Sequence, residues 1–209
     1  SKLLDALLSL SGRSLIEKNA GKFTLQPVVM EYVTEQLIDR VYGEIKTIDL
    51  ALFASHALIK PEAKDYIRES QIRTILSPLA ERLMGDFRSK KEVEYQLNEV
   101  LFQVRSRFPN SVGYAGGNLI NLLRQLKIDL SGYDFSHLSI WQAYLIGASL
   151  HRVNFAYADL SKSVFTSNSN GAMSVAFSPN GKFLAVGNLD GRIRVGRTDD
   201  YRDFLTCEG

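Results

Sequence analysis

A five-residue repeat between residues 128 and 167 restricts the fold of this chain more than any other feature. Large apolar residues recur at every fifth position, without a gap: Leu130, Phe135, Ile140, Leu145, Leu150, Phe155, Leu160 and Phe165. The residue two positions before each is most often small or β-branched, such as Ala143 or Val153. A period of five fits neither the 3.6 of an α-helix nor the 2 of a β-strand. It fits a square solenoid in which these two residues of each pentad point inward and the other three face outward.

The repeat resembles the pentapeptide-repeat family, as in Ala156-Tyr157-Ala158-Asp159-Leu160. That resemblance implies a right-handed quadrilateral β-helix with four pentads per coil. Residues 128–167 then form two coils, and residues 20 apart stack on one another. We therefore expect the ring of Phe135 to lie on the ring of Phe155. The alternative is a loop-rich all-β sandwich.

A two-coil solenoid needs covers at its ends, because each repeat buries its core mainly against its neighbours. Residues 111–127 are interpreted as a linker and a capping helix. Apolar residues at helical spacing predict a helix over residues 118–126. Asn118 is a candidate N-cap, and the preceding Gly116 and Gly117 are interpreted as a flexible hinge.

Residues 168–209 are predicted to form four short strands, at residues 172–177, 183–186, 192–195 and 204–207, which is the size of one propeller blade. The run Ser174-Val175-Ala176-Phe177-Ser178-Pro179-Asn180-Gly181-Lys182 resembles the opening of a WD-repeat blade. Gly196-Arg197 replaces the expected Trp-Asp pair, Asn170-Gly171 replaces Gly-His, and Asp190 takes the place of the structural Asp. A lone blade exposes both faces of its sheet, so we expect the chain to be part of a longer polypeptide.

Residues 1–42 read as helix, hairpin and helix, with a helix over residues 2–10, a hairpin over residues 15–25 and Pro27 at the first position of the second helix. This order matches the second half of a winged-helix domain. Winged helices often bind DNA, which is the alternative function to weigh. Phosphate contacts require clustered Lys and Arg, whereas the second helix carries Glu31, Glu35 and Asp39 against Arg40.

Residues 43–110 are predicted to form a helical bundle. Pro61 is expected to start a helix whose apolar stripe includes Ile72, Leu79 and Leu83, and Pro78 should kink or split that helix. A further helix carries an apolar stripe from Val93 to Phe108 and should end at Pro109. The bundle would join the partial winged helix to the capped solenoid.

The segment from Arg13 to Val33 resembles the end of the winged-helix part of NB-ARC proteins, which are signal-transducing NTPases. Leu25-Gln26-Pro27 stands where many relatives have Met-His-Asp, so Gln26 replaces a phosphate-contacting His. An amide can still hydrogen-bond a phosphate, and the sequence leaves open whether Gln26 senses nucleotide. No P-loop motif occurs in the 209 residues. The order of modules resembles that of the large cyanobacterial-type NB-ARC and WD-repeat proteins, and it implies an α+β multi-module fold.

Composition excludes several classes of protein. The chain has 25 Lys and Arg and 23 Asp and Glu, a net charge of +2, which argues against a nucleic-acid partner. Within the repeat, Asp129, Asp134 and Asp159 against Arg152 and Lys162 are too few acids for DNA mimicry. One cysteine and no apolar stretch of membrane length indicate a cytoplasmic protein without a membrane partner.

The search for chemistry predicts no catalytic, cofactor-binding or metal-binding residue. His56 is expected on a helix, and His137 and His151 on outward repeat positions without a shared metal. Trp141, also outward, could contact a partner, but packing against the helical segment is the preferred interpretation. Cys207 is expected in a strand, without an activating group. The predicted function is a non-catalytic scaffold of a signalling NTPase, with protein partners on the repeat surfaces and the NTPase site elsewhere. A DNA-binding winged-helix regulator and an enzyme are the alternatives, and homo-oligomerisation of the full-length protein stays open.

Overall fold

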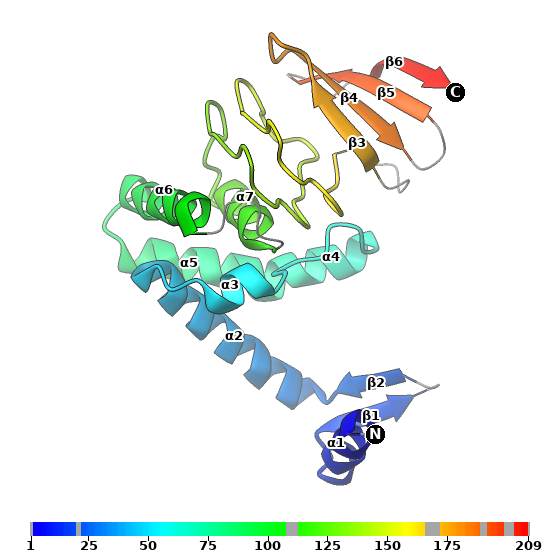
Figure 1. Cartoon of the computed structure of the whole chain (residues 1–209). Coiled ribbons are helices and arrows are strands. Elements are labelled where there is room, and N and C mark those ends of the chain that lie inside the picture. Colours follow the sequence, from blue (N-terminus) through cyan, green and yellow to red (C-terminus); the bar gives the residue numbers. More distant parts are fainter. Residues whose placement is uncertain are drawn as a thin grey trace. The chain divides into compact units, whose positions relative to one another are not determined.

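The fold is known from a computed structural model (Figure 1). It describes residues 2–19, 22–107, 113–165, 172–188, 192–198 and 203–208. The chain divides into two compact units, Ser1–Arg40 and Val41–Gly209. Among the described residues, no helix is both long and apolar enough to cross a membrane.

The N-terminal unit has the predicted order of helix, hairpin and helix. Helix α1 (Lys2–Gly12) is followed by strands β1 (Ile16–Asn19) and β2 (Lys22–Leu25), which pair antiparallel with Ile16 opposite Leu25. Helix α2 (Pro27–Thr47) begins at Pro27 as predicted, because a proline at the first helical position lacks only an N–H that would have no intrahelical partner. The helix enters the second unit at Val41 and continues past residue 42, the predicted end of the first module.

The second unit begins with helices, and one predicted start was wrong. Residues 61–63 form a turn after α3 (Ala51–Ser55), and α4 (Asp65–Gln71) begins only at Asp65. Pro78 does interrupt the helix: a π-helical turn (Ile72–Leu76) precedes α5 (Ser77–Asp86). A proline cannot donate to the carbonyl four residues earlier, so the regular ladder is broken at that point.

Helix α6 (Lys90–Arg107) buries the predicted stripe, since Val93, Leu97, Val100, Leu101 and Val104 all lie in the core. Its start carries a capping signal that the sequence interpretation missed. The Ser89 hydroxyl accepts a hydrogen bond from the Glu92 amide, and the Glu92 carboxylate accepts one from the Arg88 amide. The expected end at Phe108 and Pro109 lies outside the described residues.

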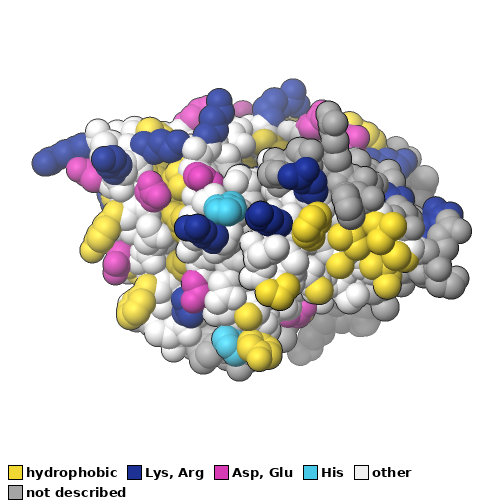
Figure 2. All heavy atoms as spheres, turned by 90° about the horizontal axis from the view of Figure 1, so that it is seen from above, with side chains coloured by type: hydrophobic (Ala, Val, Ile, Leu, Met, Phe, Trp, Pro, Cys, Tyr) yellow, Lys and Arg dark blue, Asp and Glu magenta, His cyan; other side chains and the backbone are white. Residues whose placement is uncertain are grey.

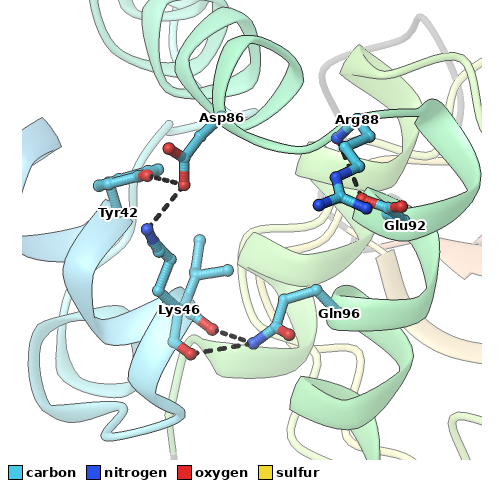
Figure 3. Close-up of polar contacts among 7 residues, drawn as sticks. Tyr42, Lys46, Asp86, Arg88, Glu92 and Gln96 are labelled. Atoms are coloured by element: carbon cyan, nitrogen blue, oxygen red, sulfur yellow. Dashed lines mark hydrogen bonds and ion pairs between the residues drawn. The ribbon is translucent and has the colours of Figure 1, made fainter.

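A polar cluster joins the end of α2 to α5 and α6 (Figure 3). The Asp86 carboxylate accepts hydrogen bonds from the Tyr42 hydroxyl, at 2.5 Å, and from the Lys46 ammonium, at 2.7 Å. These bonds hold the pKa of Asp86 below its ordinary value and raise the pKa of Lys46. Gln96 on α6 donates to the carbonyls of Ile45 and Lys46, which are among the last of α2. The end of α2 is thereby held in place on two other helices.

Helix α7 (Ala115–Gln125) corrects two predictions about the capping segment. The helix begins at Ala115, after Tyr114, so Asn118 is an interior, fully buried residue and not the N-cap. Gly116 and Gly117 lie within the helix and form no hinge. Two adjacent glycines usually indicate a break in a helix. Here they lie inside the helix because the packing against the first tier requires residues without a side chain.

Residues 128–165 wind into two stacked tiers, the first tier (residues 128–147) and the second tier (residues 148–165). Parallel bridges pair Asp134 with Asn154, Ser139 with Asp159 and Tyr144 with Val164, each 20 residues apart. The Phe135 and Phe155 rings stack as predicted, with centroids 5.7 Å apart and planes 15° from parallel. In Figure 1 the tiers, coloured green to yellow, lie between α7 and β3.

Every fifth residue from Lys127 to Lys162 adopts a left-handed backbone conformation. The positions are Lys127, Gly132, His137, Gln142, Gly147, Arg152, Tyr157 and Lys162, with φ between 53° and 79°. Each ends a two-residue turn. After most of these turns the next amide donates back to the carbonyl three residues earlier, as the Val153 amide does to the Leu150 carbonyl. The turn lets the chain change direction once per pentad, which explains the period of five.

The C-terminal part is a four-stranded antiparallel sheet in the order β3 (Ala172–Phe177), β4 (Phe183–Asn188), β5 (Arg192–Arg197) and β6 (Asp203–Glu208). All four predicted strands are present, each at least as long as expected. Asn170, Gly171 and Asp190 lie outside the described residues.

Candidate functional site

The joint between α7 and the first tier is the most specific contact of the repeat region. A Cβ added at Gly117 would overlap the Trp141 carbonyl, whose carbon would be 2.8 Å away, and one added at Gly116 would lie 2.7 Å from the Ser139 oxygen. Only glycine allows the helix backbone to approach the tier this closely. The two glycines are therefore required by the joint.

Polar side chains spaced three residues apart on α7 complete this joint. Asn121 donates to the Gln142 carbonyl and accepts from the Tyr144 amide. Arg124 donates to the carbonyls of Tyr144 and Ile146. Because the first tier has no tier beneath it, its backbone groups would otherwise lack partners, and α7 supplies them.

Asn118 ties the same helix to α3 and the loop after it. Its amide nitrogen donates to the carbonyls of Phe53 and His56, at 2.8 and 2.7 Å, and its oxygen accepts from the Leu58 amide at 2.9 Å. The side chain thus uses both of its N–H donors and one of its two acceptor positions inside the core. The residue predicted as a helix cap is thus a buried link between three segments.

Arg68 on α4 and Arg124 on α7 both lie against the Tyr144 ring, with their guanidinium carbons 4.6 and 5.1 Å from its centroid. Such cation–π contacts add to the hydrogen bonds that Arg124 makes along the same stretch. Tyr144 is therefore held by two helices at one corner of the first tier.

Trp141 packs against the helical segment, which was the preferred interpretation. Its ring meets the Tyr114 ring edge to face, with centroids 5.7 Å apart, just before α7 begins. Its indole N–H donates to Asp159 of the second tier at 2.6 Å, and the Lys162 ammonium lies 5.1 Å from its ring. Trp141 thus joins both tiers to the start of the capping helix.

Aspartate and asparagine side chains close the turns of the tiers. Asp129, Asp134, Asn154 and Asp159 each accept a hydrogen bond from the amide two residues ahead. Burial alone raises the pKa of Asp134, but hydrogen bonds from Ser136 and the charge of Arg105 outweigh burial and lower it overall. The pKa of Asp159 is likewise lowered, because hydrogen bonds from Ser161 and Trp141 outweigh its burial. These carboxylates stabilise turns and helix contacts.

The three histidines lie apart in the sequence and contact different groups. His56 follows α3 instead of lying on it, which corrects that prediction, and its Nδ1 is 2.9 Å from the Ser55 hydroxyl. His137 and His151 are exposed as predicted, and the His137 ring stacks on Tyr157 at 4.8 Å. Within the described ranges, no three His, Cys, Asp or Glu side chains group as metal ligands would. Cys207 is an exposed thiol on β6.

Gln26 lies at the junction of hairpin and helix in the N-terminal unit. Its backbone amide donates a hydrogen bond to the Leu15 carbonyl at 3.2 Å, and its backbone carbonyl accepts one from the Met30 amide at 2.8 Å. Its backbone thus starts α2, and its side chain is partly exposed.

The two faces of the C-terminal sheet differ in burial. Cross-strand pairing puts Phe177 beside Leu184 and Val175 beside Val186 on one face, the inner face. Leu184 and Val186 are only 5% and 3% exposed, so the expectation of two bare faces was wrong. The opposite, outer face is mostly apolar: it carries Ala176, Ala185, Ile193, Val195, Leu205 and Cys207, together with Ser174, Phe183 and the exposed Arg197.

The outer face is open to solvent, since Ile193 and Leu205 are 48% and 51% exposed. Viewed from above, hydrophobic side chains gather at the right of the molecule, where the C-terminal sheet lies (Figure 2). Elsewhere on the face shown, basic and acidic side chains are interspersed. Adjacent exposed apolar residues of this kind are typical of surfaces that pack against another protein element.

Comparison with known families agrees with the geometry of the tiers. Residues 128–166 match the family of pentapeptide repeats, in eight copies. The tiers are pentapeptide repeats. This confirms the prediction from the period of five.

The relatives extend the similarity to the whole chain. The chain is 43% identical over 241 residues to an uncharacterized WD repeat-containing protein of Nostoc sp. strain PCC 7120, covering 100% of this chain and 19% of the relative. A second uncharacterized WD repeat-containing protein of that strain is 40% identical over 114 residues, covering 54% of this chain and 8% of the relative. The chain thus spans about a fifth or less of these relatives' length, and it is homologous to cyanobacterial WD repeat-containing proteins. No solved structure matches it.

Proposed function

We propose that this chain is a non-catalytic connector of a signalling NTPase of the NB-ARC and WD-repeat kind. In this proposal residues 1–42 complete a winged helix, and residues 43–110 with the capping segment 111–127 form a helical support. Residues 128–167 form a right-handed quadrilateral β-helix, and residues 168–209 form the first blade of a propeller. Partner binding on the repeat surfaces would be relayed to a nucleotide switch in another part of the protein.

The outer face of the C-terminal sheet carries this proposal. A four-stranded sheet whose exposed face is mostly apolar is incomplete as a fold, because burying that face against another sheet is the ordinary way to stabilise it. The small side chains of Ala176 and Ala185 and the backbone at Gly187 leave room for a second sheet to approach closely. The names of the relatives support WD repeats as the source of that sheet.

The support beneath the sheet suits a connector. The pentapeptide repeats are anchored to the helices by the Gly117 contact, by Asn121 and by Arg124, all of which involve backbone groups of the first tier. Joints made through backbone atoms allow little sliding, since each one fixes the position of the chain itself. A sheet presented on such a support can transmit a displacement to the helices.

A binding experiment tests the proposed face. The purified chain should bind the WD-repeat region of the Nostoc relative in isothermal titration calorimetry, and Ile193→Lys with Leu205→Lys should weaken binding at least about tenfold, because each buries a charge in the contact. Tyr157→Lys, on an exposed position of the second tier, is the control and should bind as the wild type does. Equal binding by the outer-face variant, or no binding by the wild type, would contradict the proposal.

A further inference from the structure

Four aromatic rings form a continuous column from the first tier to the C-terminal sheet. Tyr133 stacks on Phe135, Phe135 on Phe155, and Phe155 on Phe177, with centroids 5.6, 5.7 and 5.5 Å apart. The planes of successive rings are within 13°, 15° and 19° of parallel. Phe177 belongs to β3, so a residue outside the repeat takes the position that the ring of a third tier would occupy.

The second tier is covered although no third tier follows it within the described residues. Leu150, Phe155 and Phe165 point into the solenoid and are all buried. A terminal repeat without a neighbour would leave such side chains in contact with water. Some other element of the chain must therefore exclude solvent from this end.

The inner face of the C-terminal sheet is in the right place to do so. Leu184 and Val186 are buried on the same face as Phe177, which touches Phe155. A separate contact is made by the turn between β3 and β4, where a Cβ on Gly181 would lie 3.7 Å from the Arg152 amide nitrogen. Two independent points of the sheet thus rest on the second tier.

We propose that the inner face of the C-terminal sheet is the cap of the second tier, as α7 is the cap of the first. Its occupant is this chain's own repeat, so a second sheet or a partner protein has to use the outer face. The inference does not depend on the sheet being a propeller blade. Loss of the cap would expose Phe155 and loosen the bonds between the tiers.

Hydrogen–deuterium exchange on the full 209-residue chain tests this cap. The second-tier amides of Asn154, Asp159 and Val164 each donate to a first-tier carbonyl at 2.9 Å and report on opening of the second tier. In Phe177→Ala, exchange over residues 150–165 should be at least about tenfold faster, because the half-buried ring that stacks on Phe155 is removed. First-tier amides that donate to second-tier carbonyls, such as those of Phe135 and Ile140, should exchange faster too, whereas exchange in α7 should stay as in the wild type.

Two further variants keep the result interpretable. Leu205→Ala removes a side chain of the outer face of the same sheet and should leave second-tier exchange unchanged. Phe177→Leu keeps an apolar side chain and should accelerate second-tier exchange less than Phe177→Ala does. Unchanged second-tier exchange in both Phe177 variants would overturn the proposal, whether or not the sheet's own amides exchange faster. The outer-face binding experiment is independent of this outcome, so the two proposals can fail separately.

Discussion

The interior of the tiers and the joint that α7 makes with them are stabilised in different ways. Inside the tiers, every pentad repeats the same elements: a large side chain, a smaller one and a left-handed turn. At the joint, the contacts follow no repeat: two adjacent glycines against carbonyls, one buried asparagine bonded to the backbone and one arginine on backbone oxygens. A repeated interaction can be weakened at one position while its neighbours still hold the fold, whereas a single contact has no substitute. The joint should therefore respond to substitution far more strongly than the turns do.

The largest effect is expected at Gly117. Gly117→Ala places a methyl group on the Trp141 carbonyl, so α7 and the first tier must move apart, which should lower the free energy of unfolding by about 3 kcal/mol. Urea denaturation followed by circular dichroism measures this change. Gly43→Ala is the matched control, because an added Cβ there meets nothing within 4 Å inside helix α2. It should stabilise the chain by about 0.5 to 1 kcal/mol, and a similar loss in both variants would contradict the comparison.

Acid should weaken the chain through a smaller, electrostatic contact between α6 and the first tier. Arg105 of α6 and Asp134 of the first tier form an ion pair at 2.9 Å, and the pKa of Asp134 is lowered in the folded state. A carboxylate with a depressed pKa stabilises the fold above its unfolded pKa of about 3.9, and this contribution is lost as the pH falls through the folded pKa.

Asp134→Asn should therefore cost less than about 1 kcal/mol at pH 7, because the pair is partly exposed. Below pH 4 its stability should approach that of the wild type. Urea midpoints measured from pH 7 to pH 3 give both curves. Parallel curves over the whole range would show that Asp134 does not contribute to the acid response.

The turns should respond least. Arg152 is exposed and adopts φ of 56°, a conformation that asparagine tolerates better than arginine does. Arg152→Asn should stabilise the chain by about 0.5 kcal/mol, measured as a small rise in thermal midpoint. A loss as large as that of Gly117→Ala would mean that single turns are as critical as the joint.

The regions also differ in what the sequence predicts. Periodicity identifies the tiers, the Phe135–Phe155 stack and the strands of the C-terminal sheet, because local patterning determines which side chains face inward there. The predicted start of α7 was wrong, because two adjacent glycines usually indicate a break between helices. Their role becomes clear only from the first-tier carbonyls that Gly116 and Gly117 contact. The three hydrogen bonds of Asn118 and the contact of Phe177 with Phe155 join segments that are distant in sequence, so no local pattern predicts them. Of the candidate interaction surface, the strands were predicted, but the difference between its two faces was not.

The bridges between residues 20 apart also limit how a chain of this kind can change its length. Twenty inserted residues would add one tier. They would move the C-terminal sheet about 4.8 Å along the axis of the tiers without turning it. Five inserted residues would instead rotate the sheet by about a quarter of a turn, because four pentads complete one tier. Insertions and deletions of whole pentads would then rotate the outer face about the axis of the tiers in steps of about a quarter turn. The same residues would point toward a different side of the molecule after each step.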